Sequence, residues 1–223
     1  MIRIHIICEG QTEESFINEV LADYFIARNI YLTPSLIGRP GHKGGNFRFE
    51  RLFQDVRGRL LGDKSAYCTT LFDFYGLPED FPGKEDASYC VDFKVKAETV
   101  ENALKSELQN KLGSEVLQRF IPYVQMYEFE GLLFSDVNAL ANGLSQPQLL
   151  SALQAIRDSF VCPEVINNSR ETAPSKRLLK LFTAYDKPLH GSLVALEIGL
   201  STIRAQCPRF NQWLTQLEQL PAL

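Results

Sequence analysis

The chain has 223 residues, of which 45% are hydrophobic, and a chain of this size and composition can bury a sizeable core. Its formal net charge of −4 does not suit a protein that grips nucleic acid over a broad basic surface, so a nucleic-acid role would need a local patch, a metal ion or a partner. The 5 cysteines include no Cys-x-x-Cys pair, which indicates free thiols rather than a zinc site or a disulfide framework.

In chain order, apolar runs that predict strands alternate with stretches of helical periodicity. The first strand is expected at residues 2–8, and Thr12 is the expected N-cap of a helix over 13–25. A second strand at 31–37 leads into the glycine-rich loop GRPGHKGGNF. A helix over 48–61 then presents one apolar face.

The same alternation continues through two further strands, and both end at carboxylates. The third strand lies in AYCTTLFDFYGLP, which is apolar up to Asp73 and broken by Gly76 and Pro78. The helix after it covers 92–112 and stops at Gly113. The fourth strand lies in RFIPYVQMYEFEGLLF and ends at Glu128 and Glu130. Strands that alternate with helices predict an α/β fold, with a mainly parallel sheet and helices on both faces.

The rest of the chain has a helical pattern. Helices are expected at 145–158, 174–184, 190–205 and 209–219, and Trp213 falls on the apolar stripe of the last one. We therefore predict an α/β domain over residues 1–135 and a helical extension over 136–223 that packs on it.

Four acids, Glu9, Asp73, Glu128 and Glu130, stand at the ends of predicted strands. The carboxyl ends of parallel strands share one edge of a sheet, so these side chains are expected to converge. Clustered carboxylates repel one another unless a proton or a cation intervenes, and their oxygens are ligands that Mg²⁺ prefers. A magnesium or manganese site is therefore predicted. The alternative is that these acids are ordinary loop or capping residues, with Glu130 in the first turn of the next helix.

Five short motifs follow one another along the chain: EGQTEE, FDFYGLP, YEFEGLLF, ETAPSKRL and KPLHG. In this order they resemble an uncharacterised bacterial family related to the Toprim domains of topoisomerases, primases and overcoming-lysogenization-defect (OLD) nucleases. Members of that family are often encoded near ATPases. The resemblance runs from Glu9 to Gly191 and implies a Toprim-like fold. It says less about activity, because the family has no settled function.

The resemblance also implies roles for individual acids. Glu9 is similar to the Toprim glutamate, a general acid–base or metal ligand, and Asp73 to the first aspartate of the Toprim Asp-x-Asp motif, a metal ligand. Tyr75 stands where the second aspartate is expected, and a phenol is a poor magnesium ligand. Either Glu128 or Glu130 replaces that aspartate, or the metal site has been lost. Glu128 is the preferred substitute because it directly follows the fourth strand.

Three basic residues are candidates for phosphate binding. Lys176 and Arg177 stand at the head of a predicted helix behind Pro174, where free backbone amides also suit a phosphate. Lys43 lies in the glycine-rich loop, which does not match a Walker P-loop. The alternatives are a capped helix with solvated basic residues and a connection without chemistry.

Two functions are expected from these features. The first is an Mg²⁺- or Mn²⁺-dependent Toprim-like nuclease that acts on DNA or RNA with an ATPase partner, in nucleic-acid processing or phage defence. The second is a non-catalytic subunit that docks an ATPase through its acidic sheet edge, and Tyr75 favours this function. A run of ~20 apolar residues and a signal-peptide pattern are both missing, which predicts a cytoplasmic protein without a membrane span.

Overall fold

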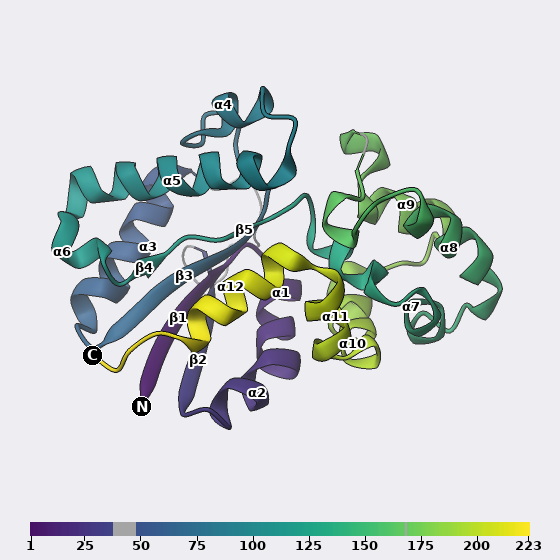
Figure 1. Ribbon diagram of the computed structural model, residues 1–223, viewed down its shortest axis with the longest axis horizontal. Coiled ribbons are helices and arrows are strands. Elements are labelled where there is room, and N and C mark those ends of the chain that lie inside the picture. The colour runs from purple at the N-terminus through teal and green to yellow at the C-terminus, as the bar shows by residue number, and fades with distance from the viewer. Residues whose placement is uncertain (38–47, 168) are drawn as a thin grey trace.

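A parallel β-sheet forms the core of one end of the elongated molecule (Figure 1). The computed structural model describes residues 1–37, 48–167 and 169–223. The strands are β1 (Ile2–Cys8), β2 (Ile30–Leu36), β3 (Ala66–Asp73), β4 (Phe120–Ile121) and β5 (Val124–Gln125). Their order is β2-β1-β3-β4, β5 also pairs with β3, and each of these pairs is parallel. The predicted α/β class with a mainly parallel sheet is confirmed.

Helices connect these strands and cover both faces of the sheet. They are α1 (Gln11–Phe16), η1 (Ile17–Leu21), α2 (Ala22–Ile26), α3 (Phe49–Gly62), α4 (Lys84–Ser88), α5 (Phe93–Leu112) and α6 (Ser114–Leu117). Ile4 of β1 packs in one hydrophobic cluster with Phe16 of α1, whereas Ile7 packs in a second cluster with Leu104 of α5. Neighbouring positions of a strand face opposite sides of a sheet, so the two clusters lie on its two faces.

The first helix begins earlier than predicted, and its N-cap is Gly10 rather than Thr12. The carboxylate of Glu13 accepts a hydrogen bond from the Gly10 amide at 3.0 Å. Thr12 lies inside the helix and is buried. A glutamate at the third helical position can reach back to the N-cap amide, and here that contact holds the Glu13 side chain next to the end of β1.

The predicted fourth strand is broken, and it does not end at Glu128. Pro122 separates β4 from β5, because a proline has no N–H to donate to the sheet. After β5, Met126 and Tyr127 precede Glu128, which is the N-cap of the 3-10 helix η2 (Phe129–Ser135). Glu130 lies in the first turn of η2, which agrees with the alternative that it belongs to the first turn of the helix after the strand.

The C-terminal region is helical, with boundaries that differ in part from those predicted. Its elements are α7 (Val137–Gly143), η3 (Pro147–Leu149), α8 (Leu150–Asp158), η4 (Pro163–Val165), η5 (Arg170–Thr172), α9 (Pro174–Leu181), α10 (Lys187–Ile198), α11 (Leu200–Gln206) and α12 (Pro208–Glu218). The helix α7 was not predicted. The expected helix over 190–205 is two helices that meet at Gly199, whose φ of +81° suits a glycine and interrupts the helix.

The last helix, α12, crosses back over the sheet (Figure 1). Trp213 stacks on Tyr123 with ring centroids 4.5 Å apart, and its indole Nε1 donates to Thr69 Oγ1 of β3 at 3.0 Å. At the end of α12, Glu218 accepts a hydrogen bond from the Tyr24 hydroxyl at 2.8 Å. The division at residues 135 and 136 remains a prediction, but the helical region packs on the sheet and shares a hydrophobic cluster with it.

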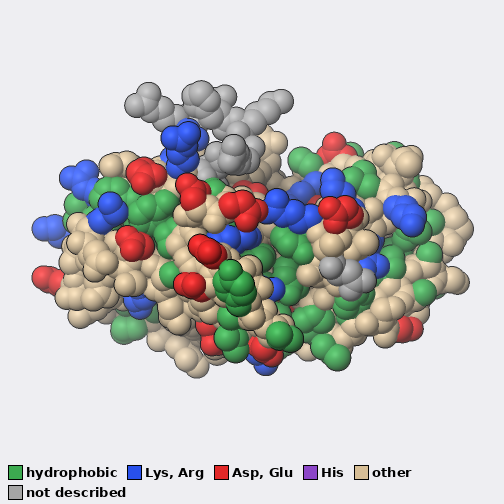
Figure 2. All heavy atoms as spheres, turned by 90° about the horizontal axis from the view of Figure 1, so that it is seen from above, with side chains coloured by type: hydrophobic (Ala, Val, Ile, Leu, Met, Phe, Trp, Pro, Cys, Tyr) green, Lys and Arg blue, Asp and Glu red, His purple; other side chains and the backbone are tan. Residues whose placement is uncertain are grey.

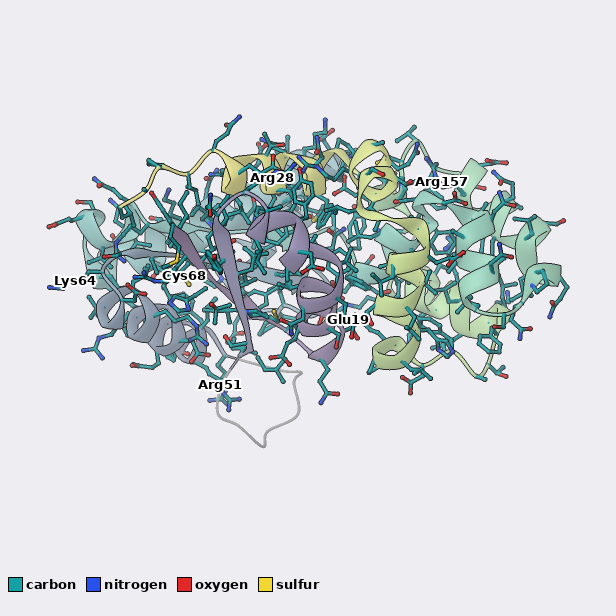
Figure 3. All side chains as sticks on the ribbon, turned by 90° about the horizontal axis from the view of Figure 1, so that it is seen from below. Glu19, Arg28, Arg51, Lys64, Cys68 and Arg157 are labelled. Carbon is teal, nitrogen blue, oxygen red and sulfur yellow. The ribbon has the colours of Figure 1, made fainter. Side chains whose placement is uncertain are left out.

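Acidic and basic side chains are interspersed across the upper face of the molecule (Figure 2). From below, Lys64 extends from the outer edge, whereas the buried Cys68 lies within the sheet (Figure 3). Among residues 1–37, 48–167 and 169–223, no helix combines the length and the apolar character that a membrane crossing requires.

Candidate functional site

A cleft of about 320 Å³ opens at the carboxyl edge of the sheet. Its lining residues are Glu9, Asp73, Tyr75, Gly76, Glu128, Glu130, Ser175, Leu179, Tyr185 and Lys187. All of the acidic residues predicted from the strand ends therefore lie in one cleft, as expected for parallel strands. The C-terminal helices supply its other wall. The roles assigned to these acids remain predictions.

Glu9 and Asp73 are positioned by the backbone of the sheet and of the segment after it. The Asp73 amide donates to Glu9 Oε2 at 3.0 Å, so the end of β3 holds the side chain that follows β1. Asp73 Oδ1 in turn accepts a hydrogen bond from the Phe129 amide at 2.7 Å. The two acids thus lie side by side because β1 and β3 are neighbouring parallel strands.

Gly76 provides the space that the Glu9 carboxylate occupies. A Cβ atom added at Gly76 would lie 2.2 Å from Glu9 Oε1 and 2.4 Å from Glu9 Cδ. Real atoms do not approach this closely, so any larger residue at position 76 must displace the Glu9 side chain.

We expect Gly76→Ala to displace Glu9 and lower the free energy of unfolding by about 1 kcal/mol, because the hydrogen bond from the Asp73 amide is lost. Urea unfolding measures this change. Gly58→Ala is the matched control, since a Cβ there meets nothing within 4 Å and alanine suits the interior of α3 better than glycine. Equal stability changes in the two variants would contradict the expectation.

A lysine lies at the centre of the acid cluster. Lys187 Nζ is 2.9 Å from Asp73 Oδ2, 3.2 Å from Glu13 Oε1 and 3.3 Å from Glu130 Oε2. The side chains of these acids are 6%, 3% and 0% exposed, respectively, whereas that of Lys187 is 33% exposed. A single ammonium group therefore forms ion pairs with three buried carboxyl groups, which we call the carboxylate cluster (Glu13, Asp73 and Glu130).

Burial governs the protonation of this cluster. It raises the pKa of Asp73 well above its ordinary value and also raises the pKa of Glu130, since a buried carboxylate loses its hydration. For Lys187, burial alone would lower the pKa, but the charges of Asp73, Glu130 and Glu13 raise it well above its ordinary value. Burial also raises the pKa of the Tyr185 phenol, with the charge of Glu130 adding to the effect. The lysine thus stays charged, while Asp73 and Glu130 retain protons more readily than usual.

Glu9 should make the stability of the protein depend on pH. Burial, with a contribution from the charge of Glu13, raises the pKa of Glu9 from 4.5 to about 7. The folded state then binds the proton more tightly than the unfolded state, so this stabilisation is complete below about pH 4.5 and is lost as the pH rises through about 7. We expect urea unfolding to show a fall in stability over this range and Glu9→Gln to reduce the fall. An identical pH dependence in the variant would contradict this assignment.

Glu128 is held by the helix on the opposite wall. Its Oε2 accepts a hydrogen bond from the Ser175 amide, near the start of α9, at 2.9 Å. A backbone amide that was expected to suit a phosphate is therefore bonded to a carboxylate of the same chain. Tyr75, which stands where a second aspartate was expected, donates its hydroxyl hydrogen bond to Asn167 Oδ1.

Two of the three predicted phosphate-binding residues, Lys176 and Arg177, do not line the cleft. Arg177 donates from Nε to the Thr172 carbonyl at 2.6 Å and lies over the Phe160 ring at 5.3 Å. Lys176 is exposed on α9. Lys43 lies outside the described residues. Within the described part of the chain, the cation that lines the cleft is Lys187.

The donor atoms of the cleft fit a divalent cation in type, because carboxylate oxygens are the ligands of Mg²⁺ and Mn²⁺. Their arrangement, however, surrounds an ammonium group. Across the described residues, no group of three or more His, Cys, Asp or Glu side chains is set up to hold a metal ion. The Lys187 ammonium instead contacts the oxygens of the carboxylate cluster. Metal binding remains a prediction.

The sequence motifs gave no site role to Tyr185 and Lys187, which line the cleft, or to Glu13, which contacts Lys187. Glu13 was assigned only to the first turn of a helix, where acids are common. Lys187 is part of the KPLHG motif, which supported the family resemblance without suggesting a role. Its separation from Asp73 by 114 positions left no local pattern to connect them.

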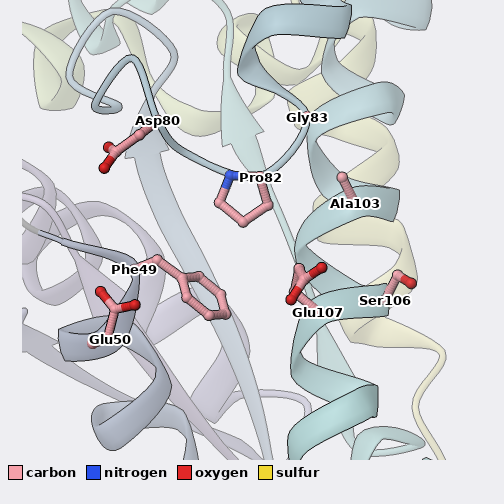
Figure 4. A pocket seen from close by; sticks show the side chains of 8 residues that line it. All are labelled: Phe49, Glu50, Asp80, Pro82, Gly83, Ala103, Ser106 and Glu107. Atoms are coloured by element: carbon pink, nitrogen blue, oxygen red, sulfur yellow. The ribbon is translucent and has the colours of Figure 1, made fainter.

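A second hollow of about 470 Å³ lies between α3, α5 and the loop before α4. The side chains of Phe49, Asp80 and Glu107 are among those that line it (Figure 4). Its described lining residues include none of the predicted site and no buried acid. The carboxyl-edge cleft is therefore the better candidate for chemistry.

The fold and the cleft define a mainly parallel α/β protein with a lysine-centred carboxylate cluster at the carboxyl edge of its sheet. A family described as a domain of unknown function (DUF4276) matches residues 8–218, and the chain belongs to this family. The expected membership of an uncharacterised family is thus confirmed. A comparison with curated proteins found no match. Among solved structures, the chain is similar to the C-terminal region of the Burkholderia pseudomallei OLD protein, with 15% identity, a TM-score of 0.49 and 96% of each chain covered.

Proposed function

We propose that the protein is a Toprim-related, Mg²⁺- or Mn²⁺-dependent phosphodiester hydrolase that acts on nucleic acid with an ATPase partner. The observation that carries the proposal is the meeting of Glu9 and Asp73 in one cleft with Glu128 and Glu130. The order of the sequence motifs supports the Toprim relation. An acidic protein with both charge signs on its upper face also gains from a partner that delivers its substrate.

Individual residues would have distinct tasks in this reaction. Glu9, whose pKa is raised to about 7 by burial, suits proton transfer near neutral pH. Asp73, Glu128 and Glu130 would hold the metal ion, which when bound supplies Lewis-acid stabilisation of charge on the phosphate oxygens. Lys187 lines the cleft and would provide positive charge towards the phosphate. The tyrosine at position 75 would hold the wall of the cleft through Asn167 instead of binding metal.

The docking function has less support from the geometry. A partner would have to reach acidic side chains at the sheet edge, but those of Asp73 and Glu130 are at most 6% exposed and already contact Lys187. The partly exposed Glu9 and Glu128 are held by backbone amides of the same chain. Buried carboxylates with an internal cation offer little to a basic surface of another protein. We therefore favour the enzyme.

The test is cleavage of supercoiled plasmid, linear DNA and total tRNA with Mg²⁺ or Mn²⁺, with and without a neighbouring ATPase. We expect metal-dependent cleavage by the wild type and a loss of about 100-fold or more in Glu9→Gln and Asp73→Asn. Glu115→Gln and Asp23→Asn alter exposed acids away from the cleft and should cleave like the wild type. If the two cleft variants cleave as fast as these controls, or if none of the proteins cleaves under any condition, the proposal fails.

A further inference from the structure

The position of Lys187 resembles that of a bound cation. Its Nζ contacts one oxygen from each member of the carboxylate cluster within 3.3 Å, and these oxygens come from α1, β3 and η2. Three elements thus converge on one positive charge. Carboxylate oxygens arranged around a point charge are also the donors that a hard divalent cation requires.

A second observation shows that the lysine does not fill the hydrogen-bonding capacity of these carboxylate oxygens. Glu130 Oε1 has no hydrogen-bond partner among the described residues, and Glu130 Oε2 and Glu13 Oε1 have only their ion-pair contacts with Lys187 Nζ, at 3.3 and 3.2 Å, without a hydrogen bond of good geometry. Glu130 is fully buried and Glu13 is 2% exposed. Buried carboxylate oxygens nearly always have hydrogen-bond donors, so these atoms point to a further ligand.

The lysine is also placed so that it can leave. It is the first residue of α10, just after the N-cap Asp186, and 33% of its side chain is exposed. The stem therefore lies at the surface while only the ammonium group reaches inward. Rotation about the side-chain torsions of Lys187 would carry the ammonium group outward.

We infer that the Lys187 ammonium and a divalent cation compete for the oxygens of Asp73 and Glu130, the two members of the carboxylate cluster that are also proposed metal ligands, so that Lys187 must leave when Mg²⁺ or Mn²⁺ enters. The two cations cannot share these oxygens, because a metal ion at coordination distance would lie next to the ammonium and the two charges would repel each other. This inference rests on the proposed function for the identity of the cation. It assigns Lys187 the role of an internal counterion that sets the affinity for metal.

The first experiment compares Mn²⁺ binding to the wild type, Lys187→Met and Lys64→Met by calorimetry at one neutral pH. Methionine keeps the length of the side chain and removes the charge. We expect Lys187→Met to bind Mn²⁺ at least about tenfold more tightly than the wild type, because the competing charge is gone. Lys64 is exposed and distant from the cleft, so Lys64→Met should bind like the wild type.

The second experiment uses the wild-type protein and remains decisive if Lys187→Met fails to fold. Amine labelling read by mass spectrometry reports the accessibility of each lysine with and without saturating Mn²⁺. Labelling of Lys187 should rise several-fold with Mn²⁺, whereas labelling of Lys64 should not change.

The outcomes separate this inference from the proposed function. Equal Mn²⁺ affinities of wild type and Lys187→Met, or unchanged Lys187 labelling in metal-bound wild type, would overturn the inference and leave the nuclease standing. Tighter Mn²⁺ binding by Lys187→Met without any cleavage by the wild type would support the competition and count against the nuclease. If neither protein binds Mn²⁺, the inference is overturned together with the metal dependence of the proposed reaction.

Discussion

Replacing Lys187 with methionine is expected to lower the free energy of unfolding by about 3 kcal/mol at about pH 8 in the absence of metal. The variant leaves the side chains of Asp73, Glu13 and Glu130, at most 6% exposed, without the cation that contacts all three. Removing one partner of a buried ion pair is costly because the remaining charge is not solvated. The loss should be at the lower end of the usual range, since the lysine side chain is 33% exposed and water screens it in part.

Urea unfolding at two pH values measures this effect and its cause. In Lys187→Met the folded-state pKa values of Asp73 and Glu130 should rise further, so the folded state binds protons more tightly than the unfolded state. Its stability should therefore approach that of the wild type at about pH 5 and fall behind as the pH rises. Lys64→Met, which changes an exposed lysine (Figure 3), should match the wild type at both pH values. A deficit that does not change with pH would show that lost packing, not charge, is responsible.

Replacing Trp213 with alanine should cost about 4 kcal/mol, because a large aromatic side chain leaves a cavity between α12 and the sheet. The indole is 2% exposed and lies parallel to the Tyr123 ring, with an interplanar angle of 10°. The substitution also leaves Thr69 Oγ1 without the indole N–H, although that hydroxyl is fully buried. The lost packing and the lost hydrogen bond both weaken the contact between α12 and the sheet.

Circular dichroism during urea unfolding is the appropriate measurement, since Trp213 is the only tryptophan and its removal abolishes tryptophan fluorescence. Tyr89→Ala provides the control, because this aromatic side chain is 78% exposed and should change stability by less than about 0.5 kcal/mol. A cost below about 1 kcal/mol for Trp213→Ala would mean that α12 contributes little to the stability of the sheet.

The layout of the sheet could be predicted because local patterns determine it. Apolar runs and helical periodicities placed β1, β2, β3, α3 and α5 within a residue or two, and Gly113 ended α5 as expected. The errors occurred where one residue overrode the pattern. Pro122 divides the fourth strand, and Gly199 divides a helix that appears continuous from its apolar residues.

The site could be predicted only as far as topology brings residues together. Glu9 and Asp73 meet because neighbouring parallel strands end at the same edge, a relation that the order of elements already implies. Lys187 could not be placed in this way, since its position depends on how α10 packs against α1 and η2. The same limit applies to Glu13, whose side chain turns back to the Gly10 amide and contacts Lys187.

The attachment of the C-terminal helices restricts how a substrate can enter. Lys187 ties the start of α10 to the carboxylate cluster, and Trp213 ties α12 to β3 on the sheet face. A hinge motion that swung the whole helical region away would break both attachments at once. Opening of the cleft is therefore expected to be a local rearrangement of a single lysine side chain, fast on the timescale of domain motions and without a large change in the shape of the molecule.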